Sequence, residues 1–326
     1  MEIVMHESIK NQLNKIFASR LQENVCMANY TTMNVGGMAD ALVIINSANE
    51  MENAIHKLWD AEIPFITLGS GSNVLVSDKG IRDLVLINRA HNMKILTNVA
   101  PCCGYAESGT SLAQFSRQLG FRGLTGFEWA SAIPGTVGGA VYGNAGAFGK
   151  DVSCNLISLE LMVPGAGKQT WLCEKMQYSY RSSILKREFQ TSVILSAIFG
   201  FEKGDMQTIK ARMDEYRQKR IQTQPSGPSM GSIFRNPPEN KAGYLIEQVG
   251  LKGKKIGGAE ISPMHANFII NTGHARAYDI LELITTIQET VKDKFNIQLI
   301  PEIQIIGDWE DKYQPLINKI NTGKQE

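Results

Sequence analysis

Three polar side chains that lie far apart in this sequence have the chemistry needed to move a proton and to stabilise a negative charge. Ser232 lies in the run GSIFRNP at 231–237, which is not the GxSxG motif of a hydrolase nucleophile. Arg181 follows Tyr180, and a guanidinium group can hold a carboxylate through two hydrogen bonds. Glu302 precedes an apolar strand. On residue type alone, a loop serine, a surface arginine and a solvent-facing glutamate are the commoner interpretations.

The segment that follows Glu302 indicates which way this carboxyl points. Side chains alternate between the two faces of a strand, so Glu302 and Gln304 share one face while Ile303 and Ile305 share the other. We expect the isoleucines to enter the core, which leaves Glu302 facing a cavity or water.

Two segments that are rich in glycine and almost free of charge could hold a dinucleotide. The first, 69–73, is a short Gly-Ser turn whose backbone N–H groups could converge on a pyrophosphate, and it matches neither GxxxxGK[ST] nor GxGxxG. The second, 132–146, is predicted to be a loop whose backbone packs closely on something flat or anionic. Plain structural turns are the alternative for each, but two such segments favour a shared dinucleotide more than either does alone. The candidate cofactor contacts are Gly69, Ser70, Gly71, Ser72, Asn73, Pro134, Gly135, Thr136, Gly138, Gly139, Asn144, Ala145 and Gly146.

The elements that must position these residues follow from hydrophobic periodicity. Ser47 and Glu50 form a capping box before a helix whose apolar residues have helical spacing. That helix separates a strand at 41–45 from a strand at 65–68, and the Gly-Ser turn follows the second strand. Further helices are predicted at 8–17, 111–119, 206–221 and 275–295, and further strands at 74–76 and 303–306.

Composition excludes several classes of protein. The 326 residues carry a formal net charge of +1, which argues against a strongly basic nucleic-acid binder or a polybasic membrane anchor. The sequence has no apolar run long enough to span a bilayer, and its first residues lack the basic patch and apolar core of a signal peptide, so we expect neither a membrane span nor a signal peptide. Its five cysteines form no CxxC, and its histidines show no metal-ligand spacing, so we expect a reducing compartment and no metal site.

Taken together, these segments resemble the UDP-N-acetylenolpyruvoylglucosamine reductase family. Any one segment is a weak signal, but the set runs in the family's order from about residue 30 to 307. The spacing between Arg181 and Ser232 resembles the shorter form of the family, which lacks an inserted substrate-covering loop. Ala132, Asn34 and Arg235 depart from the usual residues. The segments that carry the resemblance are 31–37, 68–75, 133–139, 144–149, 180–183, 231–237, 242–247, 265–268 and 301–303.

The resemblance implies an α+β protein with a vanillyl-alcohol-oxidase (PCMH) type FAD-binding fold in two subdomains and a smaller α+β substrate-binding domain. The implied bounds are 1–88 and 89–208 for the FAD-binding subdomains and 209–300 for the substrate-binding domain, with 301–326 returning to the first subdomain. It further implies non-covalent FAD, with NADPH and substrate taking turns in one cleft.

The implied reaction is reduction of the enolpyruvyl group of UDP-N-acetylglucosamine enolpyruvate to UDP-N-acetylmuramate, a cytoplasmic step of peptidoglycan synthesis that supports cell shape and division. By resemblance, Ser232 donates a proton and Arg181 stabilises negative charge on the substrate. Glu302 would assist if protonated, or would orient a proton donor. Tyr180, Arg235 and Asn236 would contact the substrate. The implied partners are small molecules only, without nucleic acid or membrane, and the protein is expected to be a monomer or weak oligomer.

Two other functions remain open at this point. One is a different FAD-dependent oxidase or dehydrogenase of the same fold that acts on an alcohol or sugar. Such enzymes often tether the flavin through histidine, and the five histidines all lie outside the two glycine-rich segments. The other is a non-enzymatic nucleotide-binding protein, which would lack a flavin spectrum.

Overall fold

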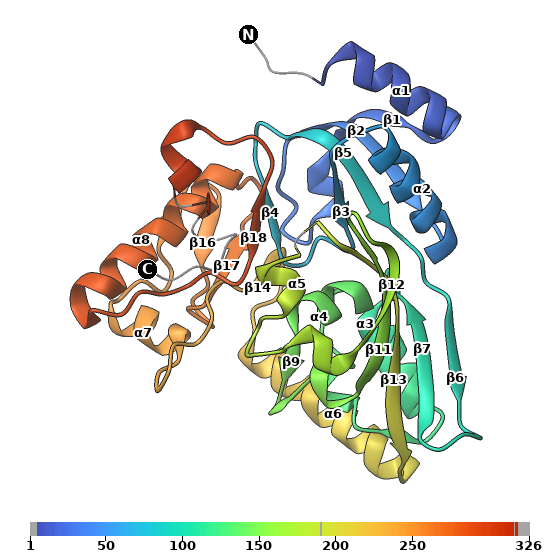
Figure 1. Ribbon diagram of the computed structural model, residues 1–326. Helices are drawn as coiled ribbons and strands as arrows, with labels where there is room; N and C mark the ends of the chain where they lie inside the picture. Colours follow the sequence, from blue (N-terminus) through green and yellow to red (C-terminus); the bar gives the residue numbers. More distant parts are fainter. Residues whose placement is uncertain (1–4, 190, 316, 319–326) are drawn as a thin grey trace.

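The computed structural model describes residues 5–189, 191–315 and 317–318, and its N-terminal part is a helix-covered sheet (Figure 1). The sheet has the order β1-β2-β5-β3, in which β2, β5 and β3 run parallel. Helix α2 buries Met51, Ile55 and Leu58. Ser47 caps this helix as predicted, but the Glu50 carboxylate accepts a hydrogen bond from the N–H of Asn46 instead of Ser47. The elements are α1 (Glu7–Phe17), β1 (Gln22–Cys26), β2 (Met38–Ile45), α2 (Ala48–Asp60), β3 (Phe65–Leu68), β4 (Val74–Val76) and β5 (Ile81–Asn88).

The central part of the chain forms a second, antiparallel sheet with the order β12-β11-β13-β7-β6. Helices α3 and α4 pack on this sheet over a core rich in aromatic rings. The ring centroids of Phe115 and Phe127 lie 5.5 and 5.4 Å from the ring centroid of Phe199. The elements are β6 (Met93–Leu96), β7 (Cys102–Glu107), α3 (Leu112–Gly120), β8 (Leu124–Thr125), η3 (Glu128–Ala130), α4 (Val137–Gly143), β9 (Gly146–Ala147), β10 (Lys150–Asp151), β11 (Leu156–Val163), β12 (Gly167–Leu172), α5 (Ile184–Arg187) and β13 (Val193–Lys203).

Helix α4 corrects the prediction that 132–146 is a loop throughout. The side chain of Thr136 caps the helix by accepting a hydrogen bond from the N–H of Gly139. Val137, Ala140 and Val141 are buried in the core beneath it. This cap and this buried stripe outweigh the low helix propensity of the glycines, which is worth about 1 kcal/mol per residue.

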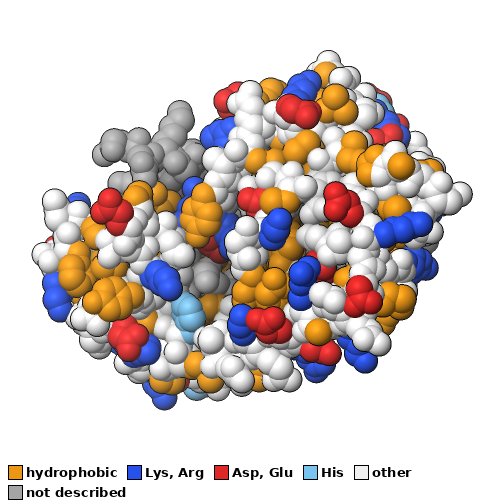
Figure 2. Space-filling view, turned by 90° about the horizontal axis from the view of Figure 1, so that it is seen from below, with side chains coloured by type: hydrophobic (Ala, Val, Ile, Leu, Met, Phe, Trp, Pro, Cys, Tyr) orange, Lys and Arg blue, Asp and Glu red, His pale blue; other side chains and the backbone are white. Residues whose placement is uncertain are grey.

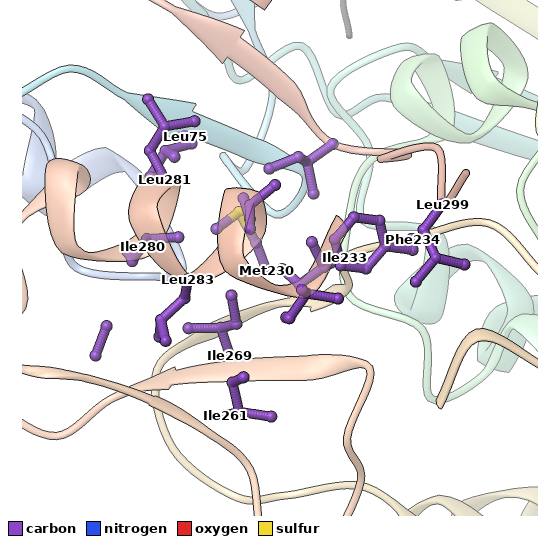
Figure 3. Close-up of a cluster of buried hydrophobic side chains, with 14 of the residues drawn as sticks. Leu75, Met230, Ile233, Phe234, Ile261, Ile269, Ile280, Leu281, Leu283 and Leu299 are labelled. Carbon is purple, nitrogen blue, oxygen red and sulfur yellow. The ribbon is translucent and has the colours of Figure 1, made fainter. Parts of the chain in front are cut away.

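The C-terminal part is a smaller lobe with its own sheet, and Leu75 of β4 also enters its core (Figures 1 and 3). Its sheet has the order β14-β17-β16-β15, and helix α8 buries Ile280, Leu283 and Ile287 against it. The elements of this lobe are β14 (Ser229–Ser232), α7 (Ala242–Gln248), β15 (Lys255–Ile256), β16 (Ala259–Ile261), β17 (Phe268–Asn271), α8 (Ala277–Phe295) and β18 (Gln304–Ile306). Helix α6 (Met206–Thr223), which precedes them in the chain, packs on the central part.

A strand pairing and a helix cap are among the contacts that fix the small lobe to the N-terminal part. Strand β18 pairs in parallel with β4. The carboxylate of Asp78 accepts hydrogen bonds from the N–H groups of Ala277 and Tyr278, at the start of α8, at 2.9 and 3.0 Å. Such a cap satisfies backbone donors that a helix leaves unpaired. Residues from distant parts of the chain can therefore meet where the lobes adjoin.

One expected domain bound needs correction. The predicted bound at 208/209 falls inside α6, which packs against α3 and η3 of the central part. We therefore propose that the substrate-binding domain begins after Thr223. The other bounds stay predictions, and residues 1–4, 190, 316 and 319–326 of the proposed domains lie outside the described residues.

No helix in the described part of the chain is long and apolar enough to cross a membrane. Among the same residues, no group of three or more His, Cys, Asp or Glu side chains is arranged to hold a metal ion.

Candidate active site

Ser232, Arg181 and Glu302 line one cavity of about 300 Å³. The cavity lies between the turn at 179–182, the end of β14 and helix α7. Figure 2 shows the molecule from below, hollowed between the smaller lobe and the larger body, with Lys and Arg side chains around the hollow. Three groups with complementary chemistry, predicted from distant segments, thus face one space.

The backbone brings Glu302 to Ser232. The N–H of Glu302 donates to the carbonyl of Ile233 at 2.8 Å, so the carboxyl is held beside the residue that follows Ser232. The amide of buried Asn267 locks the same strand, because it accepts from the N–H of Phe234 at 2.9 Å and donates to its carbonyl at 2.8 Å. Asn267 therefore positions this part of the chain. It lies in the segment 265–268 that resembles the family, but the sequence did not predict this role.

Arg181 is held in a strained turn. Its φ of 56° lies in the left-handed region, which non-glycine residues seldom adopt and which is common at functional sites. Its Nη2 donates to the carbonyl of Gly146 at 2.7 Å, and its Nε lies 3.4 Å from Oε2 of Glu302. The guanidinium is thereby tied both to the second glycine-rich segment and to the carboxyl. Tyr180 is 54% exposed and also lines the cavity.

Glu302 retains its proton to higher pH than an ordinary carboxyl. Burial raises the pKa of Glu302, and the cations Arg181, Lys186 and Arg235 oppose that rise. The folded state therefore binds this proton more tightly than the unfolded state does. As a result, protonated Glu302 contributes fully to the free energy of unfolding below pH 4.5, the ordinary pKa of a glutamate. That contribution is lost as the pH rises through the pKa of Glu302 in the folded state.

The two glycine-rich segments contact each other. A Cβ added to Gly69 would lie 2.6 Å from Oγ1 of Thr136, and one added to Gly135 would lie 3.2 Å from Oγ of Ser72. Gly71 is buried with a φ of 63°, and an added Cβ would lie 2.0 Å from the carbonyl oxygen of Tyr30. Only glycine fits at this position. The predicted convergence of the two segments is thus present as a single, closely packed backbone surface.

Helix α4 presents glycine on an open face. Gly139 and Gly143 are four residues apart and therefore lie on the same side of the helix. No heavy atom of the described residues lies within 4 Å of a Cβ added to Gly143, whereas one added to Gly138 would lie 2.7 Å from Cβ of Ser108. The Gly139 and Gly143 side of the helix is therefore open backbone. Gly143 was absent from the predicted contacts.

Comparisons with known proteins agree with this arrangement. A sequence model described as the C-terminal domain of UDP-N-acetylenolpyruvoylglucosamine reductase matches residues 222–306, and an FAD-binding domain model matches 39–172. The reductases of Caldanaerobacter subterraneus and Bacillus subtilis are each 40% identical to this chain; the first match covers 93% of this chain and 100% of the relative, and the second covers 94% and 99%. The crystal structure of the reductase from Thermus caldophilus matches with a TM-score of 0.73 and 32% identity, and covers 88% of this chain and 98% of that chain.

The chain belongs to the UDP-N-acetylenolpyruvoylglucosamine reductase family. This confirms the resemblance noted from the sequence, and the two domain matches confirm the predicted fold, with an FAD-binding part and a smaller C-terminal domain. FAD is accordingly the cofactor of this flavoenzyme fold.

Several residues predicted at the site have other duties in this reductase. The amide of Asn144 donates to Asp151 and to the carbonyl of Ser179, and it accepts from the N–H of Ser153. Its side chain therefore braces the Arg181 turn, and its contact with the cofactor stays a prediction. Likewise, the carbonyl of Gly146 accepts from Arg181.

The predicted substrate contacts divide similarly. Asn236 lines the cavity, and its Oδ1 accepts from the N–H of Ala242 at the start of α7. Arg235 is not among the lining residues; its Nε is buried without a hydrogen-bond partner among the described residues, and it is close enough to Glu302 to influence its pKa. Asn236 thus lies at the cavity wall, whereas Arg235 is adjacent in sequence but is not a lining residue.

Proposed function

We propose that this protein reduces the enolpyruvyl group of UDP-N-acetylglucosamine enolpyruvate to UDP-N-acetylmuramate, with NADPH as the reductant. The family gives the reaction, because the relatives are named for it. The observation that supports it most directly is the shared cavity of Ser232, Arg181 and Glu302. We further propose that it works in the cytoplasm, in peptidoglycan synthesis, as a monomer or weak oligomer.

The residues present fit FAD. The Gly-Ser turn and the segment around α4 meet, and the open side of α4 leaves room for a planar ring beside Gly139 and Gly143. Asn73, in the Gly-Ser turn, donates to the carbonyl of Glu302 at 3.0 Å, so this surface adjoins the cavity. When bound, FAD supplies hydride transfer from the nicotinamide to the enolpyruvyl carbon.

Within this proposal, the chain's own groups handle charge and protons. Arg181 binds the substrate carboxylate, toward which negative charge grows during reduction, so its stabilisation is greater in the transition state than in the ground state. Ser232 donates the proton that the adjacent carbon needs. A hydroxyl is a weak acid, and Glu302 and the cations beside it keep the donor oriented and electrostatically supported. Tyr180, Asn236 and Arg235 are proposed to hold the remainder of the substrate.

The visible spectrum of the purified protein tests this function. We expect a yellow protein that NADPH bleaches and that the enolpyruvyl sugar nucleotide, added afterwards without oxygen, restores to yellow. An alcohol or simple sugar in place of NADPH is the control, and bleaching by either would favour a different oxidase. If the protein shows no flavin spectrum after incubation with FAD, the proposed function is wrong. Acid precipitation should release the colour into the supernatant, because the flavin is expected to be non-covalent.

Substitution of Gly143 tests the FAD surface separately. We expect Gly143→Leu to fold, since the space beside the residue is open, and to raise the Kd for FAD at least tenfold because the side chain occupies the ring's place. Gly143→Ala should have a smaller effect on FAD and should stabilise the apoprotein by about 0.5–1 kcal/mol. The measurements are flavin fluorescence titration and apoprotein melting temperature. Unchanged FAD affinity in both variants would show that the ring lies elsewhere.

Gly138→Ala is the matched control for this pair. It lies on the same helix, but its added Cβ would lie 2.7 Å from Cβ of Ser108. We therefore expect Gly138→Ala to lower the melting temperature of the apoprotein, whereas the Gly143 variants weaken the binding of FAD.

A further inference from the structure

Lys186 is a basic residue beside the candidate site that the proposed mechanism does not use. It lies on the short helix α5, five positions after Arg181. Ser183 fixes its backbone, because the Ser183 hydroxyl accepts from the N–H of Lys186 at 3.3 Å and donates to the carbonyl of Tyr142 at 2.6 Å. Lys186 is therefore anchored to α4, the helix with the open glycine face.

The Lys186 ammonium helps to clamp the main chain of Glu302. Its Nζ lies 3.4 Å from the carbonyl oxygen of Glu302, and the same oxygen accepts from Asn73 at 3.0 Å. On the other side, the N–H of Glu302 donates to Ile233. The Glu302 peptide is thus held between α5, the Gly-Ser turn and the strand that ends at Ser232.

Three cations surround this one carboxyl. Arg181 contacts it directly, and Lys186 and Arg235 are close enough to influence its pKa. A cluster with more positive than negative charge leaves a net positive potential at the cavity wall. This potential favours binding and reduction of a substrate that carries a carboxylate.

Lys186 is the member of this cluster that can lose its charge near neutral pH. Burial lowers the pKa of Lys186 to about 8, with further lowering by Arg235 and Arg181 and opposition from Glu302. The arginines stay charged throughout. Burial also raises the pKa of Tyr142, which contacts Gln304, to about 12, and it lowers the pKa of His265, at the cavity wall, below its ordinary 6.5.

We infer that Lys186 is a positioning residue of the proposed reductase reaction, whose ammonium holds the Glu302 segment and supplies charge to the cavity, so that its deprotonation slows reduction of the substrate. The inference rests on the proposed function. Lys186 acts through Glu302 and through the field in the cavity, and it is not assigned a contact with substrate. It has one consequence that a purely structural lysine lacks, namely a dependence on pH.

The pH profile of the second half-reaction tests the inference. The kcat/KM of this half-reaction reports on the free reduced enzyme and free substrate, and it should fall as pH rises, with an apparent pKa of about 8. In kcat the same fall should occur at higher pH, because bound anionic substrate favours the charged ammonium. Reduction of the flavin by NADPH, measured by the same stopped-flow method, serves as the internal comparison.

Three substitutions separate the charge of Lys186 from its hydrogen bond. Lys186→Arg keeps the charge and should move the alkaline fall above pH 10, since a guanidinium does not deprotonate there. Lys186→Gln keeps a donor without charge, and Lys186→Met keeps neither. Both should be slower by about tenfold at pH 7, less than the roughly 10²–10³ expected for a donor at the reacting centre, and should lack the fall near pH 8. The exposed Lys219→Met is the matched control, with an unchanged profile.

A measurement that needs no turnover checks the titration itself. Competitive labelling of lysines with an amine-reactive reagent should give Lys186 a pKa near 8 instead of the ordinary 10.5. Because the unfolded state then binds the proton more tightly, wild-type stability relative to Lys186→Met should rise between pH 8 and 10.5. Below pH 8 the difference should be constant.

The outcomes separate this inference from the proposed function. A wild-type enzyme that reduces the substrate, with an alkaline fall that persists unchanged in Lys186→Met, overturns the inference and leaves the function standing. A pKa of Lys186 near 10.5 in the labelling experiment also overturns the inference and leaves the function standing. This test needs only the wild-type protein, so it holds even if Lys186→Met fails to fold. A flavin that the enolpyruvyl substrate never reoxidises at any pH overturns the function, and the inference with it.

Discussion

Replacing Ser232 by alanine should leave reduction of the flavin by NADPH intact and slow its reoxidation by the enolpyruvyl substrate by about 10³-fold, within the range found for loss of a positioned acid. The hydroxyl lines the cavity that Arg181 and Glu302 share. The first half-reaction needs no proton donated to a substrate carbon, whereas the second does. Rapid-mixing absorbance at the flavin band resolves the two steps.

Ser229→Ala is the control for this prediction. Ser229 lies on the same strand, β14, but is not among the residues that line the cavity. Both half-reactions should proceed at the wild-type rate in this variant. An equal loss in both halves for Ser232→Ala would instead mean that Ser232 orients a shared binding surface and does not donate the proton.

Local sequence signals predicted most helices. The predicted helices at 8–17 and 275–295 correspond to α1 and α8, because caps and apolar stripes act within a few residues. Ile303 and Ile305 are buried, at 2% and 1% exposure, as strand alternation predicted. The segment at 132–146 was misassigned in part because its glycines argue against a helix, while the cap at Thr136 and the core beneath α4 depend on tertiary packing.

The candidate site could be predicted only in part. The sequence indicated which side chains had useful chemistry, but Ser232 and Glu302 meet through backbone pairing between distant segments, which periodicity does not reveal. Only the resemblance to the family predicted that Ser232, Arg181 and Glu302 act together. Gly143 and Lys186, for which we propose roles, were not predicted because nothing local distinguishes them: one is a glycine among many, and the other is a lysine distinguished only by its burial among charges. The structural bonds of the Asn144 side chain could not be predicted either, because its partners Asp151, Ser153 and Ser179 are brought to it by the fold.

Substitution of Arg181 by methionine should reduce the rate of substrate reduction by about 10²–10³-fold, the loss typical of a fixed group that stabilises developing negative charge. Both kcat and kcat/KM should fall, because the contact strengthens as charge grows on the substrate carboxylate. Arg181→Lys should recover only part of the rate. A single ammonium cannot reproduce the contacts of the guanidinium with both Gly146, at 2.7 Å, and Glu302, at 3.4 Å. Stopped-flow kinetics of the second half-reaction give these values.

Arg187→Met distinguishes loss of charge from loss of the turn. Arg187 supports the same turn from outside the cavity, where it donates to Ser182 at 3.1 Å and to the carbonyl of Gln177 at 3.0 Å. If Arg181 acts through its charge, Arg187→Met should lower the melting temperature and spare most of the rate, because the guanidinium of Arg181 remains tied to Gly146. Equal slowing by the two variants would mean that the strained turn, and not the Arg181 guanidinium, is what the second half-reaction requires.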